Sequence, residues 1–438
     1  MPSSLSPTLT RLLRKAMSGA FLVYGSGALL VLLSQLFLTR LMGASQYGIY
    51  YFVLSWMMVL VIPAKLGIDH ALLRFVPAYV AKQEWSLLHG ILRWGNRTVL
   101  IGGISVAGLT ALSLLLLENQ DPWQRQTFFL ACLILPLWAL TYLRQSVLRG
   151  LKHVALALLP ELIAAPILLI SIVLIAAQFN VAPQAPMVMG ATLLAALLAL
   201  MLGHHWYRKS LPSPALHSPP QYHQNRWMTS ARALFVGSGM HVLMNNTDAI
   251  MLGLLTETDV VGIYGIAARC AFIVAFPLTV ANAIFAPMIS ELLHTERQAD
   301  LQHFLSSGMR WVIAASVSIA TMLILFSTPL LGFFGPGFTS GQDALLILVI
   351  GQLVNALSGP VAYLVAYAGH EKLTAWVLSG GGLLNILLNA LLIPLWGIQG
   401  AAIATGVSII FWNLTLYLVA RRIVHIDCSA LGQYLKSP

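Results

Sequence analysis

The sequence predicts an all-α integral membrane protein with about twelve transmembrane helices arranged as two similar halves. Three observations support this prediction: 58% of the 438 residues are hydrophobic, only 9% are charged, and the mean hydropathy is +0.82. About a quarter of the residues of a soluble domain are charged, so this composition cannot cover a water-facing surface. A bilayer core about 30 Å thick needs about 20 apolar residues per helix, and many such runs are present.

Each half contains six apolar runs long enough to span a bilayer. None of them alternates apolar and polar residues with a period of two, so strands are not predicted. The expected helices cover residues 17–39, 48–66, 98–117, 127–147, 154–177 and 185–203 in the first half, and 233–255, 260–289, 311–334, 343–368, 373–395 and 399–420 in the second.

The positions of Lys and Arg predict which side of the membrane each connection faces. With the first residue in the cytoplasm, twelve helices place all 24 Lys and Arg residues on cytoplasmic segments except Arg40, Arg125 and Arg269. This asymmetry is the positive-inside pattern of membrane proteins, and an odd number of helices would scramble it. We therefore expect a multi-pass protein with both termini in the cytoplasm. The net charge of +10 then requires no nucleic-acid partner.

The two halves carry the same short motifs in the same order, about 210 to 217 residues apart, which indicates an internal repeat. The matched pairs are GSG at 25–27 and 237–239, GIY at 48–50 and 262–264, Pro63 and Pro277, FVPAYV at 75–80 and FAPMIS at 285–290, Arg93-Trp94 and Arg310-Trp311, and Gly190-Ala191 and Gly400-Ala401. Both halves begin on the same side of the membrane, so they are parallel repeats. Transporters built this way hold substrate between two lobes that rock, and this favours a transport function.

A Pro-rich polar stretch, SLPSPALHSPPQYHQN at 210–225, separates the halves. Its composition is typical of a linker, and its irregularly spaced histidines do not indicate a metal site. We therefore expect an N-terminal six-helix lobe at 1–205, a cytoplasmic linker at 206–231, and a C-terminal six-helix lobe at 232–438 with a short basic tail.

Asp248 is an ionisable residue within the seventh predicted helix, and such residues usually face a cavity or a partner. Asn245 lies one turn earlier on the same face, and Asn246 lies near that side. One interpretation is a cavity-facing carboxylate that pairs with a cation or binds a coupling ion. The other is a carboxylate near the outer helix end, about 8 residues from the TETD loop, that water reaches.

Arg269 lies about ten residues into the eighth predicted helix. A guanidinium group does not deprotonate, so Arg269 must face water, a carboxylate or an anionic ligand. One interpretation is an internal pair with Asp248 or Glu161. The other is a fork for phosphate oxygens, which Arg binds bidentately. The two are compatible, because an anionic ligand could displace the internal pair.

Glu161 lies between Pro160 and Pro166 in the fifth predicted helix, and proline often bends helices near transport sites. The alternative is that Glu161 reaches the cytoplasmic surface. Asp69 and Arg74 could pair at the cytoplasmic mouth or extend into the membrane surface.

Several kinds of chemistry have no motif in this chain. The three cysteines, Cys132, Cys270 and Cys428, have neither metal-ligand nor disulfide-framework spacing. No GxxxxGK[ST] phosphate loop and no nucleophile–base motif is present. We expect no catalytic residues, no metal and no cofactor.

Several stretches resemble polysaccharide-biosynthesis flippases of the multidrug/oligosaccharidyl-lipid/polysaccharide exporter superfamily. The order of Asp, G-x-Y and Arg in helices seven and eight is the most specific part, together with IP-x-x-G-x-x-GAA-x-AT before the last helix. The stretches are TRLMGASQYGIYYF (39–52), LGIDHALLRFVPAY (66–79), NTDAIMLGLLTETDVVGIYGIAARC (246–270), FAPMISELL (285–293) and LNALLIPLWGIQGAAIAT (388–405).

The resemblance implies two pseudo-symmetric six-helix bundles around a central cavity in the bacterial cytoplasmic (inner) membrane. It implies transfer of an undecaprenyl-pyrophosphate-linked oligosaccharide, such as an O-antigen, exopolysaccharide or capsule unit, to the outer leaflet. Arg269 would meet the pyrophosphate, with Arg40, Arg74, Asn245 and Asn246 in the cavity wall.

The same resemblance implies coupling to an ion gradient or to the membrane potential. The coupling ion would be H+ or Na+, with Asp248, Glu161 and Asp69 as candidate coupling or structural ion-pair residues. Membrane lipids and a glycan polymerase or other export proteins are the expected partners.

Three other classes of protein stay open. An ion-coupled drug/cation antiporter of the same superfamily should carry acidic cavity residues without a central arginine, so Arg269 disfavours it. A membrane enzyme of glycan assembly needs catalytic groups on sizeable outer loops, and the outer loops here are short. A non-transporting partner or scaffold is the third class.

Overall fold

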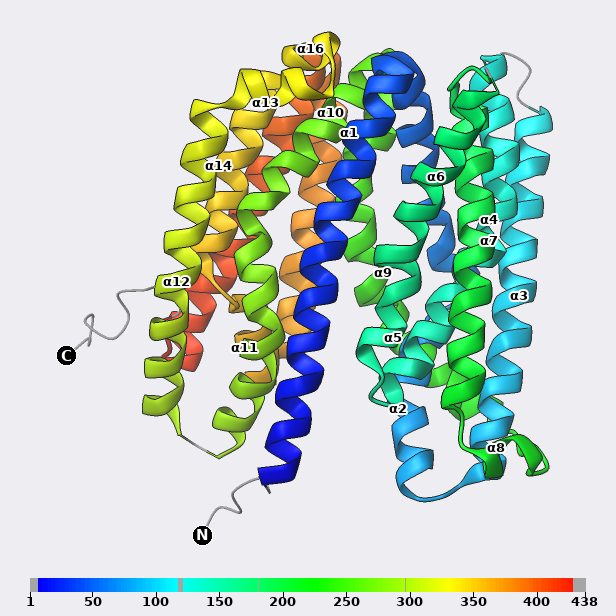
Figure 1. The fold of residues 1–438 in the computed structure, drawn as a ribbon. Coiled ribbons are helices and arrows are strands. Elements are labelled where there is room, and N and C mark those ends of the chain that lie inside the picture. Colours follow the sequence, from blue (N-terminus) through cyan, green and yellow to red (C-terminus); the bar gives the residue numbers. More distant parts are fainter. Residues whose placement is uncertain (1–6, 117–120, 180, 296, 428–438) are drawn as a thin grey trace. The chain divides into compact units, whose positions relative to one another are not determined.

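The computed structural model describes residues 7–116, 121–179, 181–295 and 297–427, and these residues are almost entirely helical (Figure 1). No strand occurs among them, which confirms the predicted all-α fold. The end of the predicted basic tail, including Lys436, lies outside the described residues.

The chain up to Leu255 forms α1 to α9 and one π-helical turn. Their bounds are α1 Pro7–Lys65, α2 Ile68–Ala81, α3 Trp85–Leu116, α4 Pro122–Gly150, α5 Val154–Leu159, η1 Pro160–Ala164, α6 Ala165–Gln178, α7 Ala185–Ser210, α8 Ser213–His217 and α9 Gln224–Leu255. The chain then continues with α10 Thr258–Phe272, η2 Ile273–Ala275, α11 Phe276–His294, α12 Gln298–Leu325, α13 Ser327–Phe334, η3 Pro336–Gly341, α14 Gln342–Ser358, α15 Val361–Val365, η4 Ala366–His370, α16 Glu371–Val419 and η5 Ala420–Val424.

Nine helical stretches within the described residues are long and apolar enough to cross a bilayer. Two of these nine stretches each contain two membrane-spanning segments separated by a glycine. Gly43 (φ 72°, ψ 174°) breaks α1 and Gly397 (φ 52°, ψ −123°) breaks α16, at backbone angles that glycine adopts most readily. Counting both parts of each, together with the shorter apolar helix Val242–Leu255, gives the twelve segments that the sequence predicts. The protein is therefore a multi-pass membrane protein.

The chain divides into two compact units. One unit is formed by Met1–Met42 and Val53–Val242, and the other by Gly43–Phe52 and Leu243–Pro438. The short segment Gly43–Phe52 of α1 thus belongs with the C-terminal unit. The predicted domain limits at 205 and 232 stay predictions.

Small residues let the helices of each unit approach closely, as is common between membrane helices. In the N-terminal unit α4 packs against α7, α3 and α2. A Cβ atom on Gly103 of α3 would lie 2.8 Å from the Cα of Pro136 in α4. In the C-terminal unit α14 packs against α16, where a Cβ on Gly351 would lie 3.0 Å from the Cα of Gly406.

The predicted linker region is docked on the N-terminal unit. The backbone N–H of Gln221 donates to the carbonyl of Ser86 at 2.9 Å, and the ring of His89 contacts the carbonyl of Ser218 at 2.7 Å. The fully buried Trp227 donates from its indole N–H to the hydroxyl of Tyr79 at 2.8 Å. These contacts hold the start of α9 against α2 and the start of α3.

Candidate ion and substrate sites

Asp248 lies on α9 and is almost fully buried, with 6% of its surface exposed. Two hydroxyls donate to its Oδ2, that of Tyr264 at 2.6 Å and that of Thr405 at 2.7 Å. The amide of Asn389 donates to its Oδ1 at 3.2 Å. Four separate segments therefore meet at this carboxylate: α9, α10 and the two parts of α16 on either side of Gly397. We refer to Asp248, Tyr264, Asn385, Asn389 and Thr405 as the Asp248 cluster.

Two asparagines of α16 complete the Asp248 cluster. Asn385 and Asn389 are four residues apart, so they share one helix face. The amide of Asn385 donates to the hydroxyl of Thr405 at 3.1 Å, and that of Asn389 donates to Oδ1 of Asn385 at 3.1 Å. Oδ1 of Asn389 is buried and has no hydrogen-bond partner. The cluster thus gathers carboxylate, amide and hydroxyl oxygens, which are the ligands that hard cations prefer.

The two other predicted polar residues of α9 lie outside this cluster. Asn245 is exposed and Asn246 is half-buried, whereas Asp248 is buried. The hydrogen-bond partners of Asp248 come from α10 and α16 and not from its own helix. The three polar residues predicted to lie on or near one face of α9 are therefore not buried together.

The two GIY motifs of the internal repeat cross each other in the C-terminal unit. A Cβ on Gly48 of α1 would lie 1.7 Å from the carbonyl oxygen of Thr258, at the start of α10. A Cβ on Gly262 of α10 would lie 2.6 Å from the carbonyl oxygen of Ala44. Only glycine permits this approach of the two backbones, which brings Tyr51 of α1 alongside α10.

Arg269 of α10 lies beside this crossing. Its guanidinium carbon is 5.3 Å from the centre of the Tyr51 ring, and Tyr47 stacks on Tyr51 with 6.1 Å between the ring centres. The Nε atom of Arg269 is buried and has no hydrogen-bond partner. No ion pair joins Arg269 to Asp248 in the described part of the chain, because the ion pairs found there involve other residues. Arg269 therefore keeps donor capacity for an anion.

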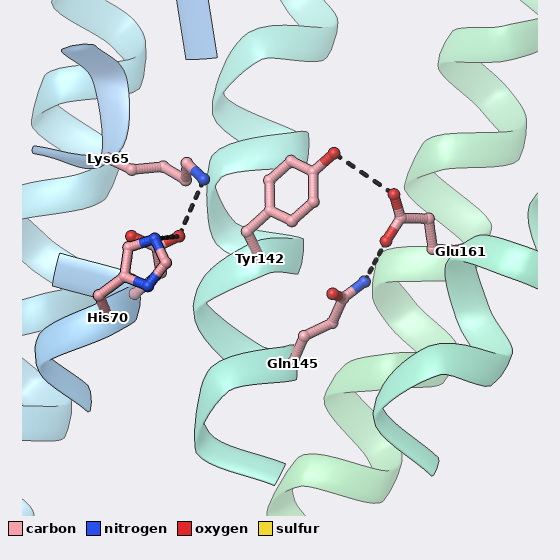
Figure 2. A network of polar contacts seen from close by, with 6 residues as sticks. Lys65, His70, Tyr142, Gln145 and Glu161 are labelled. Atoms are coloured by element: carbon pink, nitrogen blue, oxygen red, sulfur yellow. Dashed lines mark hydrogen bonds and ion pairs between the residues drawn. The ribbon is translucent and has the colours of Figure 1, made fainter. Parts of the chain in front are cut away.

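Glu161 of the N-terminal unit lies in the π-helical turn η1, directly after Pro160. Figure 2 shows that the side chains of Tyr142 and Gln145 on α4 point toward it. The hydroxyl of Tyr142 donates to Oε1 of Glu161 at 3.3 Å, and the amide of Gln145 donates to Oε2. Glu161 is thus held by two neutral donors and not by a cation.

Asp69 of α2 pairs with Lys65 at the end of α1, at 2.8 Å, and lies 3.9 Å from His70 (Figure 2). The predicted pairing of Asp69 with Arg74 is not formed. The ammonium of Lys65 also lies 4.5 Å from the centre of the Tyr142 ring, so it links the Asp69 pair to the residues around Glu161.

The other two predicted arginines belong to the N-terminal unit and are exposed. Arg74 donates to the hydroxyl of Ser230 at 3.3 Å, and Arg40 lies near the end of the first part of α1. Neither belongs to the same unit as Arg269.

Sequence reasoning missed most of the residues that surround Asp248 and Arg269. Asn385, Asn389 and Thr405 lie more than 130 residues from Asp248 in the chain. A detectable signal was the pair of asparagines at i, i+4 within the apolar run LNILLNALL. Among the described residues no three His, Cys, Asp or Glu side chains are grouped closely enough to hold a metal ion.

Solved structures of membrane transporters share this fold. An inward-facing multidrug resistance MATE family transporter matches with a TM-score of 0.77 and 12% identity, over 94% of this chain and 96% of its own. The lipid II flippase MurJ, in an inward closed conformation, matches with a TM-score of 0.70 and 14% identity, over 91% of this chain and 87% of its own. At these identities the likeness shows the fold alone.

The fold defines the class of the protein, which is a multi-pass all-α membrane protein. The family model described as polysaccharide biosynthesis protein matches residues 13–293, which is more than half of the chain. The protein belongs to this polysaccharide biosynthesis family. The MatE model also matches residues 233–391, as expected for the superfamily that the sequence resembles.

Two archaeal proteins are also similar to this chain in sequence. The membrane protein MJ1068 of Methanocaldococcus jannaschii is 21% identical over 86% of this chain and 78% of its own length. The probable flippase AglR of Haloferax volcanii is 30% identical, over 37% of this chain and 34% of its own. The match to AglR thus covers about a third of each protein.

Proposed function

We propose that the protein moves an undecaprenyl-pyrophosphate-linked oligosaccharide from the cytoplasmic to the outer leaflet of a bacterial inner membrane by alternating access. The family, a relative named as a probable flippase and the fold shared with a lipid II flippase support the class of substrate. The glycan would be a unit of O-antigen, exopolysaccharide or capsule. The observation that carries the proposal is that Arg269 has no carboxylate partner among the described residues and that its buried Nε atom has no hydrogen-bond partner.

Arg269 has the properties that a diphosphate-binding group at membrane depth requires. A pyrophosphate cannot cross hydrocarbon unaided, so a fixed cation partway across lowers the cost of its passage. Arginine keeps its charge under all conditions and binds phosphate oxygens bidentately. The buried Nε of Arg269 has no hydrogen-bond partner, and the guanidinium lies over the Tyr51 ring without a carboxylate partner. Each charged hydrogen bond to phosphate would contribute about 1.5–3 kcal/mol.

The Asp248 cluster is the proposed site of the coupling ion, and Na+ is the ion that its ligands favour. Na+ coordinates oxygen atoms, and in other transporters it binds between membrane helices. Asp248 supplies one negative charge, and the buried Oδ1 of Asn389 lacks a partner that a bound cation would provide. Because the cluster joins α10 to both parts of α16, occupancy would change how these segments pack. Glu161 and Asp69 remain candidates for a second ion-dependent step in the N-terminal unit.

An ion-coupled multidrug or cation antiporter is the second candidate. The specific observations in its favour are the MatE match at 233–391 and the fold shared with a MATE family transporter. The guanidinium of Arg269, which has no carboxylate partner in the part of the chain that the structure describes, disfavours it, because a cationic drug would be repelled there. This candidate predicts that loss of the protein raises sensitivity to cationic drugs and leaves surface polysaccharide intact.

The test is deletion of the gene in its host, followed by analysis of lipid-linked glycans in the membrane. We expect one undecaprenyl-linked oligosaccharide to accumulate and the corresponding surface polysaccharide to disappear. The identity of the accumulated lipid would define the glycan. Unchanged lipid-linked glycans together with increased drug sensitivity would contradict the flippase and support the antiporter.

A further inference from the structure

The C-terminal unit contains a cavity of about 320 Å³ that lies away from Arg269 and the Asp248 cluster. It is formed where α11 ends, α12 begins, and the irregular turns η4 and η5 approach each other. Its polar wall is made by His294, Gln298, Tyr367, His370 and His425, over an apolar floor that includes Val424. A volume near 300 Å³ is enough for a small ligand.

Three imidazole rings reach this cavity from three different elements. His294 ends α11, His370 ends η4, and His425 follows η5 with a left-handed backbone (φ 58°). Nδ1 of His294 lies 2.7 Å from the carbonyl oxygen of Ser290, and a carbonyl only accepts, so Nδ1 carries the hydrogen. The Nε2 atom of His294 can then donate to an anion only when the ring is protonated.

The charged groups on the surrounding described elements balance, because four basic and four acidic residues lie there. Arg297 is paired with Asp300 at 2.7 Å, and Asp427 accepts from the hydroxyl of Tyr417 at 3.0 Å. The exposed charges that remain nearby are those of Glu291, Glu371, Lys372, Arg421 and Arg422. None of the described residues that line the cavity itself is a carboxylate.

Two further features fit a site for an anion. Gln298 begins the 28-residue helix α12, whose N-cap residue Arg297 makes no side-chain capping bond, and such helix ends attract anions. The chain after His425 is fixed to α12, because Gln302 donates to the carbonyl of Asp427 at 2.6 Å and accepts from its N–H at 2.8 Å. The wall that carries His425 is therefore held in place.

A metal ion fits this cavity less well than an anion. No three His, Cys, Asp or Glu side chains in the described part of the chain are grouped as metal ligands, so the three imidazoles do not converge on one point. A tetrahedral phosphate can contact donors that are spread over a wider wall.

We propose that this cavity binds a phosphate group through His294, His370 and His425. The source is either the headgroup of an anionic membrane lipid or free inorganic phosphate. By the positive-inside pattern, Arg421 and Arg422 mark this end of the unit as cytoplasmic, where both are available. The proposal does not depend on the flippase function, because its test measures binding and not transport.

The test is calorimetric titration of the purified protein with inorganic phosphate in nanodiscs. One set of nanodiscs holds only phosphatidylcholine, and the other also holds phosphatidylglycerol. We expect saturable binding in phosphatidylcholine, and about tenfold weaker binding in the double variant His294→Gln/His370→Gln. His217→Gln is the matched control, because His217 is an exposed histidine with the same ring-to-carbonyl contact, 2.8 Å from Ser213. The control should bind as the wild type does.

The two sources of phosphate give different results. If a lipid headgroup occupies the cavity, phosphatidylglycerol suppresses the phosphate titration and raises the melting temperature of the wild type but not of the double variant. If free phosphate is the ligand, both nanodiscs give the same titration. Absence of saturable binding in phosphatidylcholine together with no lipid effect would overturn the proposal. Equal binding by the double variant, or Zn2+ binding through the histidines in place of phosphate, would also overturn it.

Discussion

At the scale of single residues, the two charges that the sequence singles out within the C-terminal half have different surroundings. Asp248 is held by neutral hydrogen-bond donors, while Arg269 lies over Tyr51 with a buried Nε that lacks a partner. The expected cost of burying an ionisable residue is enough to mark both as functional candidates from sequence. It is not enough to identify their partners, because Asn389 and Thr405 are brought to Asp248 only by the packing of helices distant in the chain.

We predict that Asp248→Asn removes the response of the protein to Na+. A ligand at about 100 times its Kd stabilises a protein by about 2.7 kcal/mol, so the wild type should melt at a higher temperature in NaCl than in choline chloride. The amide lacks the charge that holds the ion, and it also places an N–H donor among the donors of the cluster, which costs about 1–3 kcal/mol.

Melting curves of the purified protein over a range of NaCl concentrations measure this effect. Asp343→Asn is the control, because Asp343 is an exposed carboxylate of the same unit. It should keep the sodium response. Equal stabilisation of Asp248→Asn and the wild type by sodium would argue against the cluster as a sodium site.

At the scale of helices, sequence periodicity and length predict the spans well. The breaks at Gly43 and Gly397 separate the same pairs of helices that the sequence predicts. The repeated GIY motif can also be recognised in the sequence, but the sequence does not show that its two copies pack against each other. Only the packed helices show that Gly48 and Gly262 meet at one crossing, because glycine spacing does not specify which helices touch.

We predict that Gly48→Ala destabilises the C-terminal unit and displaces Tyr51 from Arg269. The added methyl would lie 1.7 Å from the carbonyl oxygen of Thr258, so the two helices must move apart. Overpacking of this kind usually costs about 1–3 kcal/mol. The measurement is the melting temperature of the purified variant. The control is Gly380→Ala, where the nearest atom would be an ordinary 3.9 Å away. A wild-type melting temperature for Gly48→Ala would show that this crossing is not tightly packed.

At the scale of the whole molecule, composition and charge asymmetry were sufficient to predict a multi-pass all-α protein, and the family and fold comparisons agree. The division of the chain into two compact units was harder to predict from the sequence. The segment Gly43–Phe52 lies early in the chain but clusters with the C-terminal unit, and the Pro-rich stretch near Gln221 packs on α3. Composition described this stretch as a linker because it does not report tertiary hydrogen bonds.

The central claim is that Arg269 binds the diphosphate headgroup during its passage across the membrane. Its most direct test is the leaflet distribution of the lipid-linked glycan in cells that express either the wild type or Arg269→Ala, measured by accessibility to a membrane-impermeant glycosidase. Arg125→Ala is the matched control, because Arg125 also lies over an aromatic ring, 5.9 Å from the centre of Phe129. The account predicts that the glycan is accessible from outside with the wild type and Arg125→Ala. With Arg269→Ala, at an equal protein level in the membrane, it should be at least about tenfold less accessible, as the loss of a charged hydrogen bond implies. Equal accessibility in all three strains would contradict the claim.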